Sequence, residues 1–144
     1  MVLEGDILLR VLQDITQGAR FLHAASVIHG DLKAQNILVD SRFRAKVADF
    51  GLSQKNSFYI TGTPFWMAPE LLRGEMNNTT MSDAYAFGIM LYEIYSRKEP
   101  YEGELHDIVI RAVANPDVKR RPEVPNSCPN DIKLVMLECY CEEP

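Results

Sequence analysis

Hydrophobic positions along the chain fall into helical and strand-like periods in its first third. From Asp6 to His23, apolar residues recur at spacings of three and four, which predicts an amphipathic helix. A short apolar run, 37–39, and an alternating segment, 45–48, flank the turn-forming segment Asp40-Ser41-Arg42 and predict a small β-hairpin. The predicted buried face of the helix consists of Leu8, Leu12, Ile15, Ala19 and Leu22.

A central buried helix is predicted further along the chain. The segment Met81 to Tyr95 is apolar nearly all round, which is typical of a helix at the middle of a domain. Ser82 or Thr80 is expected to cap its N-terminus through the side-chain hydroxyl. The polar segment 51–62 lacks periodicity and predicts a loop before this helix.

Two further helices are predicted toward the C-terminus. The segment Leu105 to Ala114 is amphipathic, and Asn115-Pro116 stops it. A proline-punctuated loop follows over residues 117–129. The last helix begins after Pro129 and is expected to bury one face, made of Ile132, Val135, Met136 and Cys139. The pattern as a whole predicts one mainly helical domain of the α+β class with a small hairpin.

Composition narrows the classes of protein to consider. The 144 residues are 47% hydrophobic and 24% charged, enough for one domain with its own core. A net charge of -5 argues against a nucleic-acid partner, and no run approaches the roughly 18 apolar residues of a membrane span. The start of the chain is acidic and lacks the apolar stretch of a secretory signal.

The cysteines favour a reducing compartment. Cys128, Cys139 and Cys141 are odd in number and clustered late, so they do not make a disulfide framework. Cys139 and Cys141 lack a second pair or a nearby histidine, which argues against a zinc site. We therefore expect a cytoplasmic protein.

The motifs that carry chemistry lie on the predicted loops around the hairpin. In chain order they are His29-Gly30-Asp31-Leu32-Lys33-Ala34-Gln35-Asn36, Asp49-Phe50-Gly51 and Ala68-Pro69-Glu70. Each motif alone is a weak signal, but their order and their loop–hairpin–loop context are specific. The chain resembles the C-terminal lobe of a eukaryotic-type protein kinase over essentially its whole length. The resemblance implies a protein-kinase-like fold, ATP and Mg²⁺ as cofactors, and a protein substrate.

The resemblance also implies roles for individual residues. Asp31 would orient the hydroxyl of the substrate and accept its proton, and Lys33 would reach the transferred phosphate. Asn36 and Asp49 would bind Mg²⁺, because amide and carboxylate oxygens are the hard ligands that this ion prefers. A short hairpin brings its two ends together, so these two ligands can share one ion. The position of Leu38 matches the residue that packs under the adenine ring.

Further residues of the resemblance support the site. Thr63 would support Asp31 and shape the surface beside the phosphoacceptor, and Lys33 is typical of serine/threonine-directed members. His29 and Phe50 match positions of a hydrophobic column through the active kinase. Asp83 matches an acid that holds the catalytic loop through backbone N–H groups. A carboxylate in so apolar a helix needs such partners, because an unpaired buried charge is very costly.

The chain also departs from the family pattern. No glycine-rich phosphate loop or strand lysine precedes the first helix, so we expect a partial kinase domain, residues 1–144, that lacks the N-terminal lobe and is truncated at both ends. Gly30 stands where most members carry an arginine that collects an activation-loop phosphate. We expect a serine/threonine kinase of the tyrosine-kinase-like group that acts in signal transduction. The alternative is a pseudokinase scaffold without catalysis.

Overall fold

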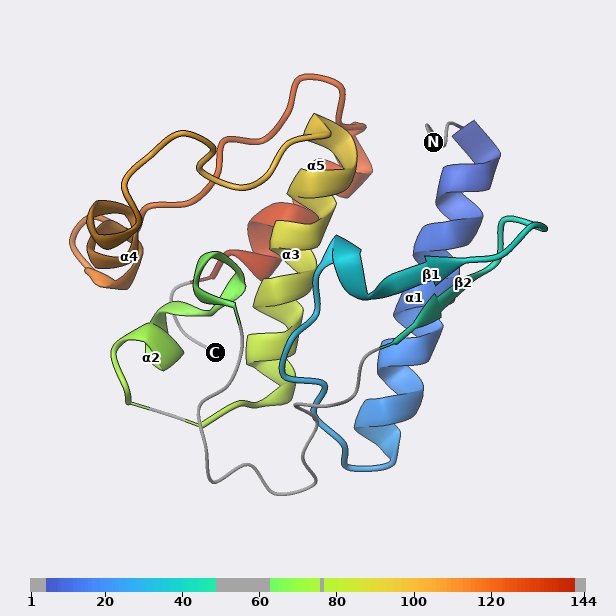
Figure 1. Ribbon diagram of the computed structural model, residues 1–144, viewed down its shortest axis with the longest axis horizontal. Helices are drawn as coiled ribbons and strands as arrows, with labels where there is room; N and C mark the ends of the chain where they lie inside the picture. The colour runs from blue at the N-terminus through green and yellow to red at the C-terminus, as the bar shows by residue number, and fades with distance from the viewer. Residues whose placement is uncertain (1–4, 49–62, 76, 142–144) are drawn as a thin grey trace.

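Five helices and one hairpin make up the parts of the chain that the computed structural model describes, residues 5–48, 63–75 and 77–141 (Figure 1). Two single turns of 3₁₀ helix, η1 (Ala34–Asn36) and η3 (Pro64–Trp66), lie in the loops. The elements in chain order are α1 (Gly5–Ala24), β1 (Ile37–Val39), β2 (Ala45–Val47), α2 (Pro69–Leu72), α3 (Thr80–Ser96), α4 (His106–Ala114) and α5 (Asn130–Cys139). This mainly helical architecture with a small antiparallel sheet confirms the predicted fold class.

Helix α3 runs through the middle of the molecule, with α5 packed along it (Figure 1). Its apolar composition places side chains in the core on several sides of the helix, as the pattern predicted. Ile89 and Met90 are 0% exposed and Leu91 is 1% exposed. Burying each such side chain stabilises the fold by roughly 1.5–3 kcal/mol relative to leaving it exposed. Helix α3 is therefore firmly held in the core and can support the loops that pack on it.

Gly88 allows α3 and α5 to approach closely. A Cβ atom added at this position would lie 2.6 Å from Cys139 Cβ and 3.2 Å from the Tyr140 ring. The gain in helix propensity from Gly to Ala, about 1 kcal/mol, is smaller than the cost of forcing two helices apart, which typically reaches 1–3 kcal/mol or more. The close helix contact explains this glycine.

We expect Gly88→Ala to lower the free energy of unfolding of the full-length protein by up to about 2 kcal/mol, the overpacking cost less the gain in helix propensity. Gly18→Ala in α1 is the matched control, because its new Cβ would meet only the side chain of Val47, at 3.1 Å from Cγ2. Urea unfolding of the two variants checks the ranking. Equal stabilities for both variants would contradict the packing role of Gly88.

Asp14 fixes the hairpin to α1. Its carboxylate accepts hydrogen bonds from Ala45 N at 3.0 Å, from Arg44 Nε at 3.0 Å and from Arg44 Nη2 at 2.7 Å. The backbone bond from Ala45, helped by the Arg44 guanidinium, holds the pKa of Asp14 below its ordinary value. This stabilising contribution is present above the ordinary carboxyl pKa and is lost as the pH falls through the lowered value.

The hairpin brings its two ends together, as predicted. Strands β1 and β2 are antiparallel with Leu38 opposite Lys46. Beyond the strands, Ala48 N donates to Asn36 O at 2.8 Å, so position 48 lies beside the end of the loop 29–36. The turn depends on Asp40, whose Oδ1 accepts from the backbone N–H of Arg42 and Arg44.

Two local predictions were wrong. The N-cap of α3 is Thr79, and Ser82 is its partner in a reciprocal capping box at the third helical position. Val135 on α5 is 40% exposed, whereas Met136 is fully buried. The buried face of α5 follows Ile132, Met136 and Cys139 at spacings of four and three, and Val135 lies about 100° around the helix from Met136.

The first helix buries a slightly different stripe from the predicted one. Leu12 and Ile15 are buried as expected, and Val11 is buried with them. Leu8, Ala19 and Leu22 are half-buried. The predicted loop over 51–62 lies outside the described residues.

Candidate active site

Asp83 anchors the start of the loop that carries Asp31. Its Oδ2 accepts from His29 N at 2.8 Å and its Oδ1 accepts from Gly30 N at 3.0 Å. This confirms the prediction that an acid on the central helix holds the loop by backbone N–H groups. The His23 Nε2 atom lies 2.9 Å from Asp83 Oδ2, a third contact that the sequence did not reveal. Asp83 is 2% exposed, so these contacts compensate the burial of its charge.

His29 lies inside the loop and links its two sides. Asp31 N donates to His29 Nδ1 at 3.0 Å, so the imidazole proton is on Nε2. This Nε2–H donates to Ala48 O at 2.9 Å, at the end of the hairpin. His29 is 1% exposed and fixes the backbone of Asp31 relative to the hairpin. Phe50, its predicted partner in the hydrophobic column, lies outside the described residues.

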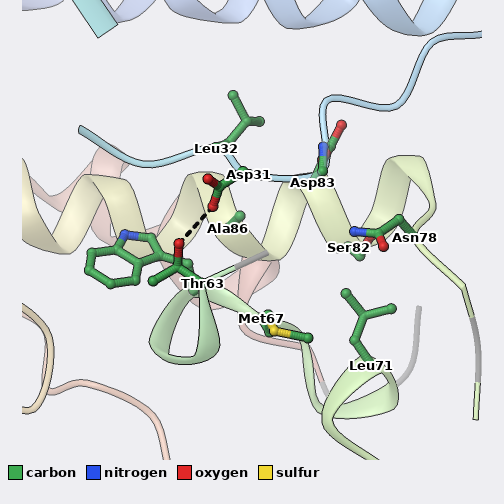
Figure 2. A pocket seen from close by; sticks show the side chains of 11 residues that line it. Asp31, Leu32, Thr63, Met67, Leu71, Asn78, Ser82, Asp83 and Ala86 are labelled. Atoms are coloured by element: carbon green, nitrogen blue, oxygen red, sulfur yellow. Dashed lines mark hydrogen bonds between the residues drawn. The ribbon is translucent and has the colours of Figure 1, made fainter. Parts of the chain in front are cut away.

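Asp31, Thr63 and Lys33 meet in one short chain of hydrogen bonds. The Thr63 hydroxyl donates to Asp31 Oδ1 at 2.8 Å and accepts from Lys33 Nζ at 3.0 Å. Lys33 Nζ lies 4.0 Å from the second oxygen, Asp31 Oδ2. Figure 2 shows the Asp31 and Thr63 side chains facing each other from separate loops. The hydroxyl of Thr63 therefore orients a carboxylate whose second oxygen, Oδ2, accepts no hydrogen bond from the described residues.

A small cavity of about 10 Å³ lies beneath this group, between the loop and α3 (Figure 2). Its walls include Gly30, Asp31, Thr63 and Asp83. A space of this size holds roughly one water molecule. It is therefore too small to hold a substrate.

Asn36 ends the same loop. Its Nδ2 donates to Asp31 O at 2.7 Å, which turns the amide so that its carbonyl oxygen points away from the loop backbone. Within the described residues this oxygen makes no hydrogen bond, and a free amide oxygen is a ligand type that suits Mg²⁺. Asn36 therefore fits its predicted role. Asp49, the second predicted ligand, lies outside the described residues.

Leu38 lies on β1, two residues beyond Asn36. Its side chain is 60% exposed, unlike the neighbouring β1 residues Ile37 and Val39, which are half-buried. An exposed leucine at the edge of the site is available to pack against an apolar ring. Its contact with adenine stays a prediction.

Glu93 and Trp66 also belong to the site, although the sequence analysis did not single them out. Glu93 Oε2 accepts from Ala34 N and from Trp66 Nε1, each at 2.9 Å. Burial raises the pKa of Glu93, and the two hydrogen bonds and the nearby Lys33 partly offset this rise. The signal was available, since Glu93 is a second carboxylate in the apolar central helix and needs partners as Asp83 does.

Comparison with known proteins agrees with this geometry. A family model described as protein tyrosine and serine/threonine kinase matches residues 2–144. In Dictyostelium discoideum, one probable serine/threonine-protein kinase is 37% identical over 99% of this chain, and another is 42% identical over 90% of it. A dual specificity protein kinase of the same organism is 35% identical over 94% of the chain. The chain belongs to the protein tyrosine and serine/threonine kinase family.

The chain corresponds to a minor part of each relative. It spans 11% and 8% of the first two proteins and 28% of the third. Within the described residues, no helix combines the length and the apolar composition that a membrane crossing requires.

Proposed function

We propose that the full-length protein transfers the γ-phosphoryl group of ATP to serine or threonine hydroxyls of a protein substrate. The observation that supports this most is the chain of hydrogen bonds from Lys33 through Thr63 to Asp31. It supplies an oriented carboxylate and a cation next to each other, which are the parts that phosphoryl transfer requires. A cytoplasmic location and a role in signalling remain predictions.

In the proposed mechanism, Asp31 Oδ2 accepts a hydrogen bond from the substrate hydroxyl while Thr63 holds Oδ1. The hydroxyl oxygen forms a bond to the γ-phosphorus, the bond from that phosphorus to the bridging oxygen breaks, and ADP leaves. The hydroxyl proton passes to Asp31. Lys33 lies close enough to Asp31 to stabilise the transferred phosphoryl charge.

Asn36 and Asp49 would hold the magnesium ion, which when bound supplies positive charge beside the phosphates. Asn36 presents its amide oxygen because its nitrogen is engaged by Asp31 O. The exposed Leu38 offers an apolar surface for the adenine ring.

The preference for serine and threonine rests on Lys33, two residues after Asp31, and on the names of the two serine/threonine-protein kinases among the relatives. The test is phosphoamino-acid analysis of a mixed protein acceptor after incubation with the full-length protein and Mg-ATP. We expect phosphoserine and phosphothreonine. Phosphotyrosine as the main product would contradict the proposed acceptor class, and no product at all would favour the scaffold.

Gly30 predicts activity without phosphorylation of the loop after Asp49. Gly30 has φ of 86°, a conformation that glycine adopts without strain, and its N–H is held by Asp83. It has no side chain to collect a loop phosphate, so phosphorylation cannot order the loop through this position. We expect kcat to change less than about threefold after phosphatase treatment, which is less than about 0.7 kcal/mol in activation free energy.

The loop acceptors to replace together are Ser53, Ser57, Tyr59 and Thr61, which lie outside the described residues. We expect the quadruple variant, with alanine at positions 53, 57 and 61 and phenylalanine at position 59, to keep its activity. Loss of activity from both the phosphatase treatment and the variant, with the fold intact, would show a phosphate switch and contradict the role given to Gly30.

A further inference from the structure

The loop that carries Asp31 is tied to α3 at two points by two different carboxylates. Asp83 binds the N–H groups of His29 and Gly30, before Asp31. Glu93 binds the N–H group of Ala34, after Lys33. Ten residues separate the two acids on the helix, which corresponds to about 15 Å along its axis. The reacting segment 31–33 is thus held at both ends by one rigid helix.

The same oxygen of Glu93 also holds the second loop of the site. Glu93 Oε2 accepts both from Ala34 N and from Trp66 Nε1, at 2.9 Å each. Trp66 belongs to η3, which begins directly after Thr63, and Lys33 Nζ lies 5.7 Å from the centre of its ring. A single Glu93 oxygen therefore joins the loop with Thr63 to the loop with Asp31 and Lys33, in addition to the direct hydrogen bonds that Thr63 makes to both residues.

We propose that Glu93 is a positioning residue that keeps the Thr63 hydroxyl in register with Asp31 and Lys33. It acts through the two loops that it joins by its hydrogen bonds to Ala34 N and Trp66 Nε1. The inference rests on the proposed function, because its consequence is the geometry of phosphoryl transfer. The backbone N–H of Ala34 and the Nε1–H of Trp66 both donate to one oxygen atom of Glu93. This accepting oxygen, and not the negative charge, therefore does the positioning. Burial raises the pKa of Glu93, so the protein keeps an acceptor here against a desolvation cost.

Substitutions at position 93 separate these possibilities. Glu93→Gln keeps one carbonyl oxygen at the same reach, and that oxygen has two lone pairs for the two donors. Glu93→Leu has similar size and no acceptor. We expect Glu93→Leu to lower kcat/KM for the protein acceptor about tenfold to a hundredfold, the range for two lost neutral hydrogen bonds, and Glu93→Gln to stay within about threefold of the parent.

The partner residue gives a second measurement. Trp66→Phe keeps an aromatic ring and removes the Nε1–H donor, so it is expected to lower kcat/KM for the acceptor less than Glu93→Leu does. The combined loss in the double variant is expected to be smaller than the product of the single losses, because both changes break the same link. Full additivity of the two changes in free energy would contradict a shared link.

The experiment uses the full-length protein, with separate KM values for ATP and for the acceptor and with thermal unfolding of every variant. The control is Glu99→Gln, an exposed acid near Glu93 that affects it only through its charge. We expect the KM for ATP to be unchanged throughout and the acceptor KM to rise in Glu93→Leu, whereas mere unfolding lowers kcat and leaves both KM values alone. Parental acceptor kinetics in Glu93→Leu, or equal losses in Glu93→Leu and Glu93→Gln, would overturn the proposal.

Failure of the proposed function gives a different result. If the parent transfers no phosphate, the kinase proposal fails, and the ¹⁹F signal of 5-fluorotryptophan at position 66, assigned through Trp66→Phe, then decides the role of Glu93. A shifted signal in Glu93→Leu and a parental signal in Glu93→Gln support the link between the loops. An unchanged signal in Glu93→Leu overturns it.

Discussion

Replacing Asp31 by asparagine in the full-length protein is expected to lower kcat for phosphoryl transfer about 10²- to 10⁴-fold, the range for loss of a general base. Asparagine has the same shape, and its amide oxygen can still accept from the Thr63 hydroxyl, which donates to Asp31 at 2.8 Å in the parent. The fold and the loop contacts are therefore kept. What is lost is the second carboxylate oxygen, which would take the proton of the substrate. Steady-state assays with saturating Mg-ATP measure the effect.

Asp117→Asn is the matched control for this substitution, because Asp117 is exposed in the loop after α4 and carries the same charge. We expect it to leave kcat unchanged. Asp49→Ala, which removes a proposed metal ligand, is expected to lower activity in the same direction as Asp31→Asn. Parental rates in both the Asp31 and the Asp49 variants would refute the assigned roles.

Replacing Asp83 by alanine is expected to have the largest effect on stability. Asp83 is 2% exposed and serves three donors, namely His29 N, Gly30 N and His23 Nε2. Removing one side of a buried charged network typically costs 3–5 kcal/mol, a large part of the roughly 5–15 kcal/mol that stabilises a domain. We expect a lower midpoint in urea unfolding and the loss of activity in the protein that remains folded, since the backbone before Asp31 is no longer held.

The exposed Asp107 on α4 provides the control for Asp83→Ala. Asp107→Ala is expected to change the free energy of unfolding by less than about 0.5 kcal/mol, as is usual at exposed positions. The stability of Asp83→Asn should lie between those of the two alanine variants. Its amide has one accepting oxygen, whereas the donors in the parent use both carboxylate oxygens of Asp83. Equal stability of Asp83→Ala and Asp107→Ala would contradict the anchoring role of Asp83.

The parts of the site that could be predicted were those with a strong local or energetic signal. The hairpin followed from a short apolar run and an alternating segment on either side of the turn residues that begin at Asp40. The anchoring by Asp83 followed from the cost of a charge in an apolar helix. Thr63 and Lys33 were expected near Asp31 from the resemblance, and their hydrogen bonds place all three together.

The parts that could not be predicted depend on distances between segments far apart in sequence. His23 reaches Asp83 across 60 positions, and Trp66 reaches Glu93 across 27, so no local pattern reports either contact. The error at Val135 has a different origin, because spacings of three and four leave a choice between neighbouring residues of a helix. Only the packing of α5 against α3 decides which of Val135 and Met136 is buried.

The central claim is that this site transfers phosphate, and the most direct measurement is the turnover of the full-length protein with γ-labelled ATP, Mg²⁺ and a serine-containing protein acceptor. We predict turnover of about 1–100 s⁻¹, lost on chelation of the metal and reduced to background in Asp31→Ala. Folded protein whose transfer does not exceed that of Asp31→Ala would contradict the claim and favour a scaffold.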